Sequence, residues 1–512
     1  MSPAAVTAAG PRHFALDATV AFAVGAAFSL PCTYTEAWWL QFLCVGLLAW
    51  RAGRATPARA AWLGLAFGTG WLGAGTWWLF ISLHRYGGLP APLAVVAVAA
   101  LSLALSGYLA IALGLFAHWR RGKAVPDALL FAALWLTAEL ARGILFTGFP
   151  WVATGYGQID GQLAALAPWL GVYGIGFVVT SFAALPALAL HATRRQAVVA
   201  ALGIAALLAL APWAARDFSA PAETLGVTLV QTNVAQDEKF APERLPEALS
   251  WLEGVLRDAR GPLVIAPETA IPLLPDQLGP DAWGRLTARF AGGQTALLVG
   301  LPLGSYDAGY TNSVAGVSAQ TAAGPGAFYR YDKQHLVPFG EFVPPGFRWF
   351  VDLMHIPLGD FSRGPPVPAS FAFAGQRIAP NICYEDLFGE ELALRFADAP
   401  QAPTVLANVS NIGWFGDSIA IAQHLHISRM RTLELQRPML RATNTGATAL
   451  IDHRGKVVAH LAPFMRGTLD VTVEGRTGLT PFARWAGAFG VAPLAALALA
   501  VVALAGRWRR AP

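Results

Sequence analysis

The sequence predicts two structural parts: a polytopic α-helical membrane domain with about eight spans, and an α/β domain inserted before the last span. Its 512 residues are 55% hydrophobic and only 13% charged, which is about half the charged fraction of an ordinary soluble domain. Seven apolar runs precede residue 215, and an eighth closes the chain. Between residues 220 and 480 the pattern changes to short β-rich segments that alternate with helical ones. This composition excludes a disordered chain and an ordinary soluble enzyme.

The apolar runs give the positions of the expected spans, because a helix needs about 20 apolar residues to cross a bilayer. Those before residue 215 are 14–31, 37–50, 61–82, 91–117, 128–148, 164–190 and 196–214. The run 37–50 is the shortest, and the run 486–506 is the eighth. Only Arg12 is basic ahead of the first run and further spans follow at once, so we do not expect a cleaved signal peptide. The expected domains are 1–215 for the membrane bundle, 216–485 for the α/β domain, and 486–512 for a last span with a basic tail.

Basic residues in the loops between the runs predict the orientation of the bundle. Alternate loops carry them, starting from the N-terminus: Arg12; Arg51, Arg54 and Arg59; Arg120, Arg121 and Lys123; Arg194 and Arg195. The intervening loops carry only Arg85, whereas Arg507, Arg509 and Arg510 follow the last run. By the positive-inside rule both termini are cytoplasmic. Residues 216–485 then lie on the far side, which is the periplasm in a host with two membranes.

The net charge of +5 also comes from the membrane part of the chain and its C-terminal tail. Residues 1–215 contain 11 Lys and Arg against 5 Asp and Glu, and residues 507–512 add three Arg, whereas residues 216–506 contain 22 against 26. Loops retained in the cytoplasm explain this distribution better than a nucleic-acid partner, which we do not expect. The three cysteines, Cys32, Cys44 and Cys383, cannot form a disulfide framework.

Strand and helix patterns alternate through the α/β domain. Strands are expected at 226–231, 262–267, 296–302, 328–333, 377–383, 404–410, 440–446 and 447–455, and helices near 243–259, 281–291, 387–397 and 419–436. Three motifs with reactive side chains follow such strands. They are Ala266-Pro267-Glu268-Thr269, the segment from Tyr331 to Glu341 that contains Lys333, and Asn381-Ile382-Cys383-Tyr384-Glu385-Asp386. Strand ends are where α/β sheets place their functional sites.

The residue types in these motifs fit one chemistry. A thiol has a pKa of ~8.5, so Cys383 needs a base or a cation to become a useful nucleophile near neutral pH. The Glu268 carboxylate is able to take its proton, and the Lys333 ammonium is able to stabilise a thiolate and then an oxyanion. The backbone N–H of Tyr384 is a natural second oxyanion donor. The motifs therefore predict an acyl-transfer site that uses no metal and no cofactor.

The same motifs carry a resemblance to known families. The α/β domain resembles the carbon–nitrogen hydrolase (nitrilase) superfamily, whose Glu–Lys–Cys triad lies on a four-layer α-β-β-α sandwich. The whole chain, with seven preceding spans and one following span, resembles the apolipoprotein N-acyltransferase family of the bacterial inner membrane. Further matching segments are 145–151, 171–174, 333–344, 429–434 and 441–446. The sequence departs from this family at Phe240, where Trp is common, and at Ile412, where Asp is common.

The resemblance implies roles for individual residues. It makes Glu268 the general base, Lys333 the oxyanion stabiliser and Cys383 the nucleophile. Supporting positions are Glu341, Tyr384 and Glu385. Candidate substrate contacts are Phe240, Trp349 and Trp414, together with the apolar segment 344–361, which we expect to dip into the outer leaflet. Glu139 and Arg142 in the fifth run are expected to pair because single charges are costly inside a bilayer; a structural ion pair and a lipid-headgroup contact both remain open.

The resemblance implies an integral inner-membrane acyltransferase whose active site faces the periplasm. The sequence does not determine the oligomeric state, for which we expect a monomer. The enzyme would move the sn-1 acyl chain of phosphatidylethanolamine to the α-amine of the S-diacylglyceryl cysteine of an apolipoprotein. The expected route is ping-pong through a Cys383 thioester. One alternative is a membrane-anchored amidase or nitrilase with water as the acceptor, although eight spans exceed the anchor that hydrolysis needs. Another is a transporter or sensor whose α/β domain only binds a ligand, which would not need the three reactive residues.

Overall fold

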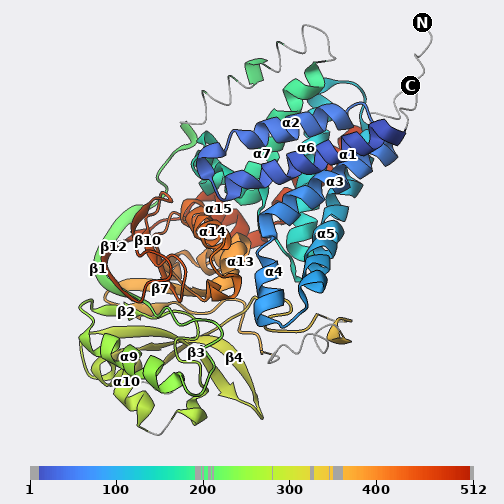
Figure 1. Ribbon diagram of the computed structural model, residues 1–512. Coiled ribbons are helices and arrows are strands. Elements are labelled where there is room, and N and C mark those ends of the chain that lie inside the picture. The colour runs from blue at the N-terminus through green and yellow to red at the C-terminus, as the bar shows by residue number, and fades with distance from the viewer. Residues whose placement is uncertain are drawn as a thin grey trace, which may run out of the picture.

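The computed structural model describes residues 11–190, 213–278, 281–322, 328–344, 346–349 and 361–507, together with isolated positions between 198 and 209. A bundle of long helices packs against a domain that contains two β-sheets (Figure 1). The described helices before residue 190 belong to the bundle, and the last helix of the chain packs on it again. This arrangement confirms the predicted fold class of a helical membrane domain joined to an α/β domain.

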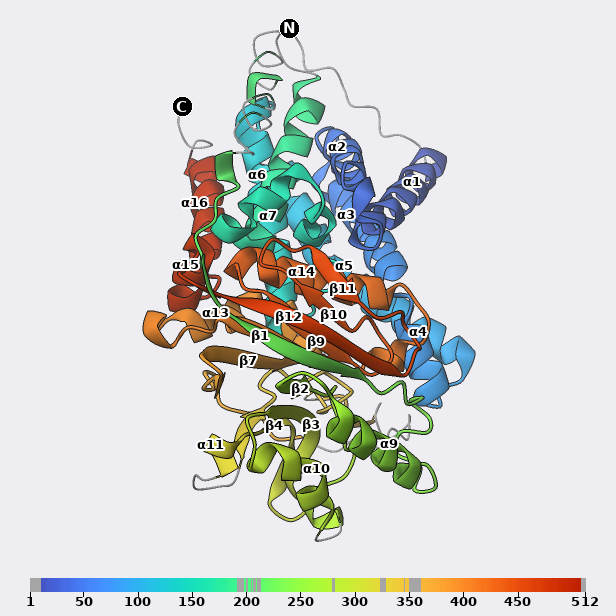
Figure 2. The ribbon, with the colours of Figure 1, turned by 90° about the vertical axis from the view of Figure 1, so that its left-hand side faces the viewer.

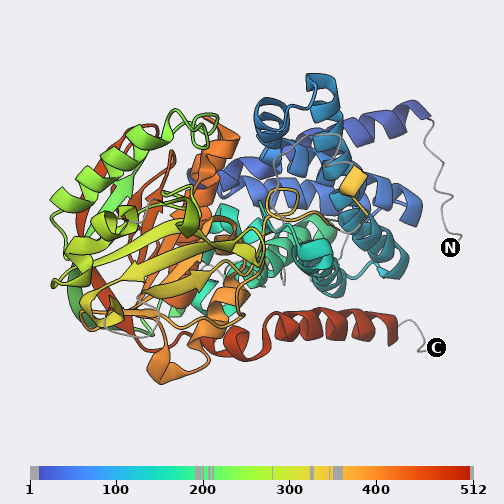
Figure 3. The ribbon, with the colours of Figure 1, turned by 90° about the horizontal axis from the view of Figure 1, so that it is seen from below.

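Six of the predicted apolar runs form helices before residue 190. They are α1 (Pro11–Ser29), α2 (Leu40–Ala52), α3 (Pro57–Thr76) with the short α4 (Leu79–Ile81), α5 (Ala91–Trp119), α6 (Ala124–Ile144) and α7 (Ala167–Ala189). The predicted run 196–214 falls largely outside the described residues. The last run forms α15 (Pro481–Phe489) and α16 (Ala492–Arg507), which meet at an angle of 87°. Figure 3 shows α16 along one side of the bundle, where it packs on α6.

Fewer helices pass a test of length and apolarity than the eight spans expected. Within the part of the chain that the structure describes, four segments are long and apolar enough to cross a membrane, and the bent α15–α16 pair makes five if it counts as one span. Helix α2 is only 13 residues long. Helix α3 has 20 residues but is rich in glycine, which lowers its apolarity. Those glycines serve close packing, because a Cβ at Gly70 would lie 2.0 Å from the Phe22 carbonyl oxygen of α1.

The α/β domain contains two six-stranded sheets. The first has the order β12-β1-β2-β3-β4-β5, and its strands are β1 (Ala220–Gln231), β2 (Leu263–Ile265), β3 (Ala296–Ser305), β4 (Gly309–Val317), β5 (Tyr329–Asp332) and β12 (Gly467–Thr477). The second has the order β11-β10-β9-β8-β7-β6, and its strands are β6 (Phe371–Phe373), β7 (Gln376–Ile382), β8 (Val405–Ser410), β9 (Met439–Thr443), β10 (Ala449–Ile451) and β11 (Val457–His460). Each sheet has a parallel centre, β1-β2-β3 or β7-β8-β9, and antiparallel edges.

The two sheets pack face to face, and helices cover both outer faces (Figure 2). Apolar residues of both sheets, among them Leu229, Ile265 and Val409, form the core between them. Helices α9 (Leu245–Asp258) and α10 (Ala282–Ala291) cover the first sheet. Helices α13 (Gly389–Ala393), α14 (Ala420–Leu435) and α15 cover the second. The domain is therefore the four-layer α-β-β-α sandwich that the family resemblance implied.

Helix α14 lies between the second sheet and the membrane bundle, where it packs on α7. Its Gln423 side chain connects the two parts: Oε1 accepts hydrogen bonds from the indole N–H groups of Trp78 (3.1 Å) and Trp151 (2.8 Å). Its Nε2 donates to the Gly75 carbonyl at 3.0 Å. One apolar core continues from the bundle into α14, so the sandwich is docked firmly on the bundle.

Candidate active site

The three sequence motifs meet at one edge of the sandwich. Glu268 follows β2, Lys333 follows β5 and Cys383 follows β7, and these three strands are drawn from both sheets. Lys333 is almost completely buried, with 1% of its side chain exposed. Its Nζ lies 2.9 Å from Glu341 Oε1 and 3.5 Å from Glu268 Oε1. The structure thus gathers one ammonium group and two carboxylates beside the Cys383 thiol, which interacts electrostatically with all three.

Asn312 in β4 completes this cluster, and the sequence analysis did not find it. Its side-chain N–H group donates to Glu268 Oε1 and to Glu341 Oε1, each at 2.7 Å. Its backbone carbonyl accepts from the Lys333 N–H at 2.8 Å. An uncharged amide therefore spaces the two carboxylates, whose mutual repulsion would otherwise oppose their being so close. The only signal in the sequence was an amide residue within a short polar stretch, Thr311-Asn312-Ser313, of strand β4.

Glu268 is held from several sides. The backbone N–H of Asn411, which follows β8, donates to its Oε2 at 2.8 Å. The buried Lys239 ammonium donates to its backbone carbonyl at 3.0 Å. Burial lowers the pKa of Lys239 to about 8, against the opposing effect of the Glu268 charge. The turn also needs a glycine beneath it, because a Cβ at Gly300 of β3 would lie 2.4 Å from the Pro267 carbonyl oxygen.

Cys383 begins the tight 3-10 turn Cys383–Leu387 and has a φ of +52°, a conformation that is costly for a residue with a side chain. Burial raises the pKa of its thiol, the Glu268 charge raises it further, and the Lys333 charge opposes them. The neutral thiol therefore dominates at physiological pH. A nucleophilic attack by sulfur requires a base to take its proton at the same time, and the Glu268 carboxylate is placed beside it.

Lys333 has the opposite electrostatic balance. Burial by itself lowers the pKa of its ammonium, but the charges of Glu341 and Glu268 raise it by more, so the net shift is upward. The side chain consequently stays positively charged at any pH at which the protein works. A permanent cation is suited to stabilising negative charge and is unsuited to acting as a base.

Glu385 ties the lysine segment to the cysteine turn. Its Oε1 accepts from the backbone N–H of Gln334 at 2.7 Å, and its Oε2 accepts from the Tyr331 hydroxyl and the Ile382 N–H, both at 2.6 Å. The neighbouring Tyr384 hydroxyl donates to the Gly148 carbonyl, in the loop after α6, at 2.9 Å. These two residues therefore orient backbone segments around the site.

Of the residues expected to contact substrate, two are largely exposed and one packs on the bundle. Phe240 and Trp349 are more than half exposed, at 55% and 65%. The Trp414 ring packs edge-on against Tyr86 of the membrane bundle, with ring centres 5.8 Å apart. Most of the expected apolar arm, residues 350–360, lies outside the described residues. Substrate contacts by these residues stay a prediction.

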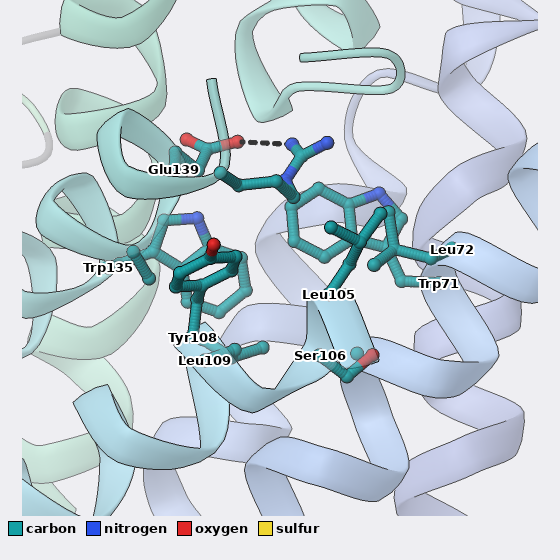
Figure 4. Close-up of a pocket in the computed structure, with 11 residues that line it drawn as sticks. Trp71, Leu72, Leu105, Ser106, Tyr108, Leu109, Trp135 and Glu139 are labelled. Carbon is teal, nitrogen blue, oxygen red and sulfur yellow. Dashed lines mark ion pairs between the residues drawn. The ribbon is translucent and has the colours of Figure 1, made fainter. Parts of the chain in front are cut away.

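Glu139 and Arg142 form the expected buried pair within the bundle, with Arg142 Nη2 3.7 Å from Glu139 Oε1 (Figure 4). Arg142 Nη1 also donates to the carbonyls of Phe149 (2.7 Å) and Trp151 (2.8 Å). Glu139 Oε1 accepts from the Thr154 N–H at 2.8 Å. The adjoining cavity of about 10 Å³ has room for about one water molecule. In this conformation the pair holds the loop after α6, and a headgroup contact stays a prediction.

Comparison with known proteins agrees with both parts of the chain. Residues 24–185 match the family model of the apolipoprotein N-acyltransferase N-terminal domain, and residues 227–482 match that of carbon–nitrogen hydrolase. An apolipoprotein N-acyltransferase of Verminephrobacter eiseniae is 52% identical, with 89% of each chain covered. One of Ralstonia nicotianae is 44% identical, covering 100% of this chain and 98% of that one. This chain belongs to the apolipoprotein N-acyltransferase family.

Solved structures similar to the sandwich are more distant. A carbon–nitrogen hydrolase of Helicobacter pylori is 14% identical and superposes with a TM-score of 0.36. The alignment covers 49% of this chain and 89% of the hydrolase. The NitFhit protein of C. elegans is also 14% identical, with a TM-score of 0.37. Here the alignment covers 56% of this chain and 65% of the NitFhit protein. The apolipoprotein N-acyltransferase family thus joins a helical bundle to a carbon–nitrogen hydrolase domain, and the resemblance expected from the motifs is confirmed.

Proposed function

We propose that this protein is an inner-membrane acyltransferase that moves an acyl chain from a phospholipid to the N-terminal amine of a diacylated apolipoprotein. The observation that carries the proposal is the cluster of buried Glu268 and Lys333 with half-buried Cys383, docked on an apolar bundle. The full-length relatives of the chain are named apolipoprotein N-acyltransferases. The sn-1 chain of phosphatidylethanolamine is the proposed donor. The loop charges favour a periplasmic location for the sandwich.

The first half-reaction forms a thioester. Cys383 Sγ attacks the ester carbonyl of the phospholipid while Glu268 takes the thiol proton. Lys333 Nζ and the Tyr384 N–H stabilise the resulting oxyanion. When the tetrahedral intermediate collapses, the C–O bond breaks and protonated Glu268 returns its proton to the departing lysophospholipid. Because the thiol pKa is raised, little thiolate exists before the attack. The rate therefore depends mainly on proton transfer to Glu268 during the attack.

The second half-reaction forms an amide. The amine of the diacylglyceryl cysteine attacks the thioester carbonyl, and Glu268 takes a proton from its nitrogen. The same two donors stabilise the oxyanion. Collapse breaks the C–S bond, and the departing sulfur regains a proton from Glu268. Glu341 and Asn312 keep Lys333 and Glu268 in place through both halves, since each contacts one or both of these side chains.

The two half-reactions separate in time, which provides the test. Purified protein incubated with phosphatidylethanolamine alone should gain one acyl mass on the peptide that contains Cys383, and hydroxylamine should remove it. A diacylated lipopeptide added next should discharge the acyl group to its own N-terminus. Steady release of free fatty acid without a lipopeptide would indicate a hydrolase instead. Intersecting double-reciprocal plots with no trapped adduct would rule out the ping-pong route.

A further inference from the structure

His424 of α14 lies directly behind the nucleophile and is almost completely buried, with 1% of the residue exposed. Its Nε2 is 3.2 Å from the carbonyl oxygen of Cys383. Its Nδ1 is 2.9 Å from Nη2 of Arg441 in β9. The steps of the proposed function do not use this histidine, yet both of its ring nitrogens are engaged, one of them with the backbone of the reacting residue.

The arginine determines which ring nitrogen carries the proton. A guanidinium group only donates hydrogen bonds, so His424 Nδ1 has to accept from Arg441. In the neutral ring the proton then lies on Nε2, which donates to the Cys383 carbonyl. Arg441 is itself fixed by Ser428 Oγ and by Asp386, whose Oδ2 lies 3.4 Å from Nη1. Burial and the Arg441 charge both lower the pKa of His424 well below its usual value, which keeps the ring neutral.

A hydrogen bond to the Cys383 carbonyl also sets the direction of the next N–H. The peptide group is planar and trans, so the C=O of Cys383 and the N–H of Tyr384 point in opposite directions. Tyr384 is the second residue of the 3-10 turn, where an N–H has no acceptor within the turn. The amide of Asn408 approaches the same carbonyl at 3.4 Å. Holding the carbonyl towards α14 therefore aims the Tyr384 N–H away from α14.

We infer that His424 is a positioning residue of the oxyanion site: its Nε2–H fixes the Cys383–Tyr384 peptide so that the Tyr384 N–H meets the developing oxyanion. The inference rests on the proposed function of Cys383. The hydrogen bond also withdraws electron density from the peptide, which strengthens the opposite N–H as a donor. The turn itself needs such a restraint because Cys383 has a φ of +52°.

The same ring joins the oxyanion site to the membrane bundle. His424 stacks on the Trp151 ring at an interplanar angle of 15°, with centres 5.9 Å apart. The Trp151 carbonyl is held by Arg142, and its indole N–H is held by Gln423. The bundle therefore buttresses the face of the ring, while Arg441 fixes its edge.

Two reactions of Cys383 separate positioning of the oxyanion donor from general damage. Acylation by phosphatidylethanolamine passes through an oxyanion, whereas alkylation by iodoacetamide does not. In His424→Phe, which keeps an aromatic ring but loses both nitrogens, acyl-Cys383 should form roughly 10- to 100-fold more slowly. Alkylation of the same peptide should change less than about twofold. His424→Gln, whose Nε2 replaces the lost donor, should recover most of the acylation rate.

His426→Phe is the matched control, because His426 is a half-buried histidine of the same helix whose ring lies against the Thr33 carbonyl. It should acylate and alkylate as the wild type does. The inference is overturned if His424→Phe acylates at the wild-type rate, if acylation and alkylation fall by the same factor, or if His424→Gln is no better than His424→Phe. If His424→Phe acylates normally and Cys383→Ala is inactive, only this inference is rejected. Active Cys383→Ala rejects the proposed function itself.

A measurement on the unmutated protein does not depend on whether a variant folds. The ¹⁵N chemical shifts of His424 report which ring nitrogen is protonated. Its resonances are assigned as those that disappear from the spectrum of His424→Gln. The expected result at pH 7 is a neutral ring with the proton on Nε2. A proton on Nδ1, or a doubly protonated ring, would contradict the arrangement.

Discussion

Two buried ion clusters distinguish the halves of this molecule. In the membrane bundle, Glu139 faces Arg142 one to one at 3.7 Å, and backbone groups of a single loop, together with the Thr154 hydroxyl, take up their other hydrogen bonds. In the sandwich, Lys333 contacts two carboxylates and lies beside a thiol, while the nearby Lys239 donates to the backbone carbonyl of Glu268. A pair with one positive and one negative charge is suited to holding a loop in place. A cluster with more carboxylates than it needs to neutralise Lys333 keeps a proton acceptor beside the neutral Cys383 thiol. We therefore expect the Glu139–Arg142 pair to be structural and the cluster around Cys383 to be reactive.

The sharpest test of this contrast is removal of the nucleophile. Cys383→Ala should abolish transfer and let the diacylated lipoprotein accumulate, which mass spectrometry of lipoprotein N-termini in cells would detect. Cys383→Ser should be almost as damaging, because an alcohol is far harder to ionise than a thiol. Cys44→Ala, in α2, is the control and should retain activity. Transfer by a folded Cys383→Ala protein would place the chemistry elsewhere.

The next largest effect is expected from disturbing the charge balance in the sandwich. Lys333→Met leaves two buried carboxylates without their cation and removes an oxyanion donor, so the rate of acyl transfer should fall at least ~10²-fold. Glu268→Gln should cost a similar factor through loss of the base. Initial rates with a diacylated lipopeptide measure both. If either folded variant keeps its full rate, that residue has no part in the mechanism.

The pH dependence of Cys383 follows from the direction of its pKa shift. Because burial and Glu268 raise the thiol pKa above its ordinary value, the thiolate fraction in the folded protein keeps rising throughout the range from pH 6 to 9. Alkylation of Cys383 by iodoacetamide should therefore increase about tenfold per pH unit over that range. In the unfolded chain the increase should level off near pH 8.5. A plateau below pH 8 in the folded protein would mean that Lys333 outweighs the other two effects.

The smallest effect on catalysis is expected in the bundle. Glu139→Gln leaves Arg142 buried without its partner charge, which should cost roughly 3–5 kcal/mol of stability while the kcat of the surviving folded protein changes less than about threefold. Thermal unfolding in detergent and steady-state kinetics give the two values. The double variant Glu139→Gln/Arg142→Gln should regain part of the stability, and the exposed Arg85→Gln serves as the control. A large rise in KM for phospholipid at unchanged stability would instead assign the pair to headgroup binding.

Several features followed from the sequence because they depend on neighbours in the chain. Runs of apolar residues predicted the helices of the bundle, and the motifs around Glu268, Lys333 and Cys383 identified the candidate site. The β-rich segments predicted eight of the twelve described strands but not β4, β6, β11 or β12. Each of these signals lies within a window of about 20 residues. The family resemblance added the four-layer sandwich, which no local pattern specifies. The number of spans was harder to predict, because the glycines that let α3 pack closely also lower its apolarity.

The tertiary structure alone decided which distant residues complete the site. Asn312 reaches Glu268 because β4 lies next to β3 and β5, and Lys239 reaches it through a loop of the first sheet. His424 contacts Cys383 from α14, and its tautomer is set by Arg441 of β9. Hydrogen bonds act over about 3 Å, so their partners depend on sheet order and helix docking, which bring together residues that are far apart in the chain. The sequence determined the reactive groups, and the packing of two sheets and a bundle determined their geometry and charge balance.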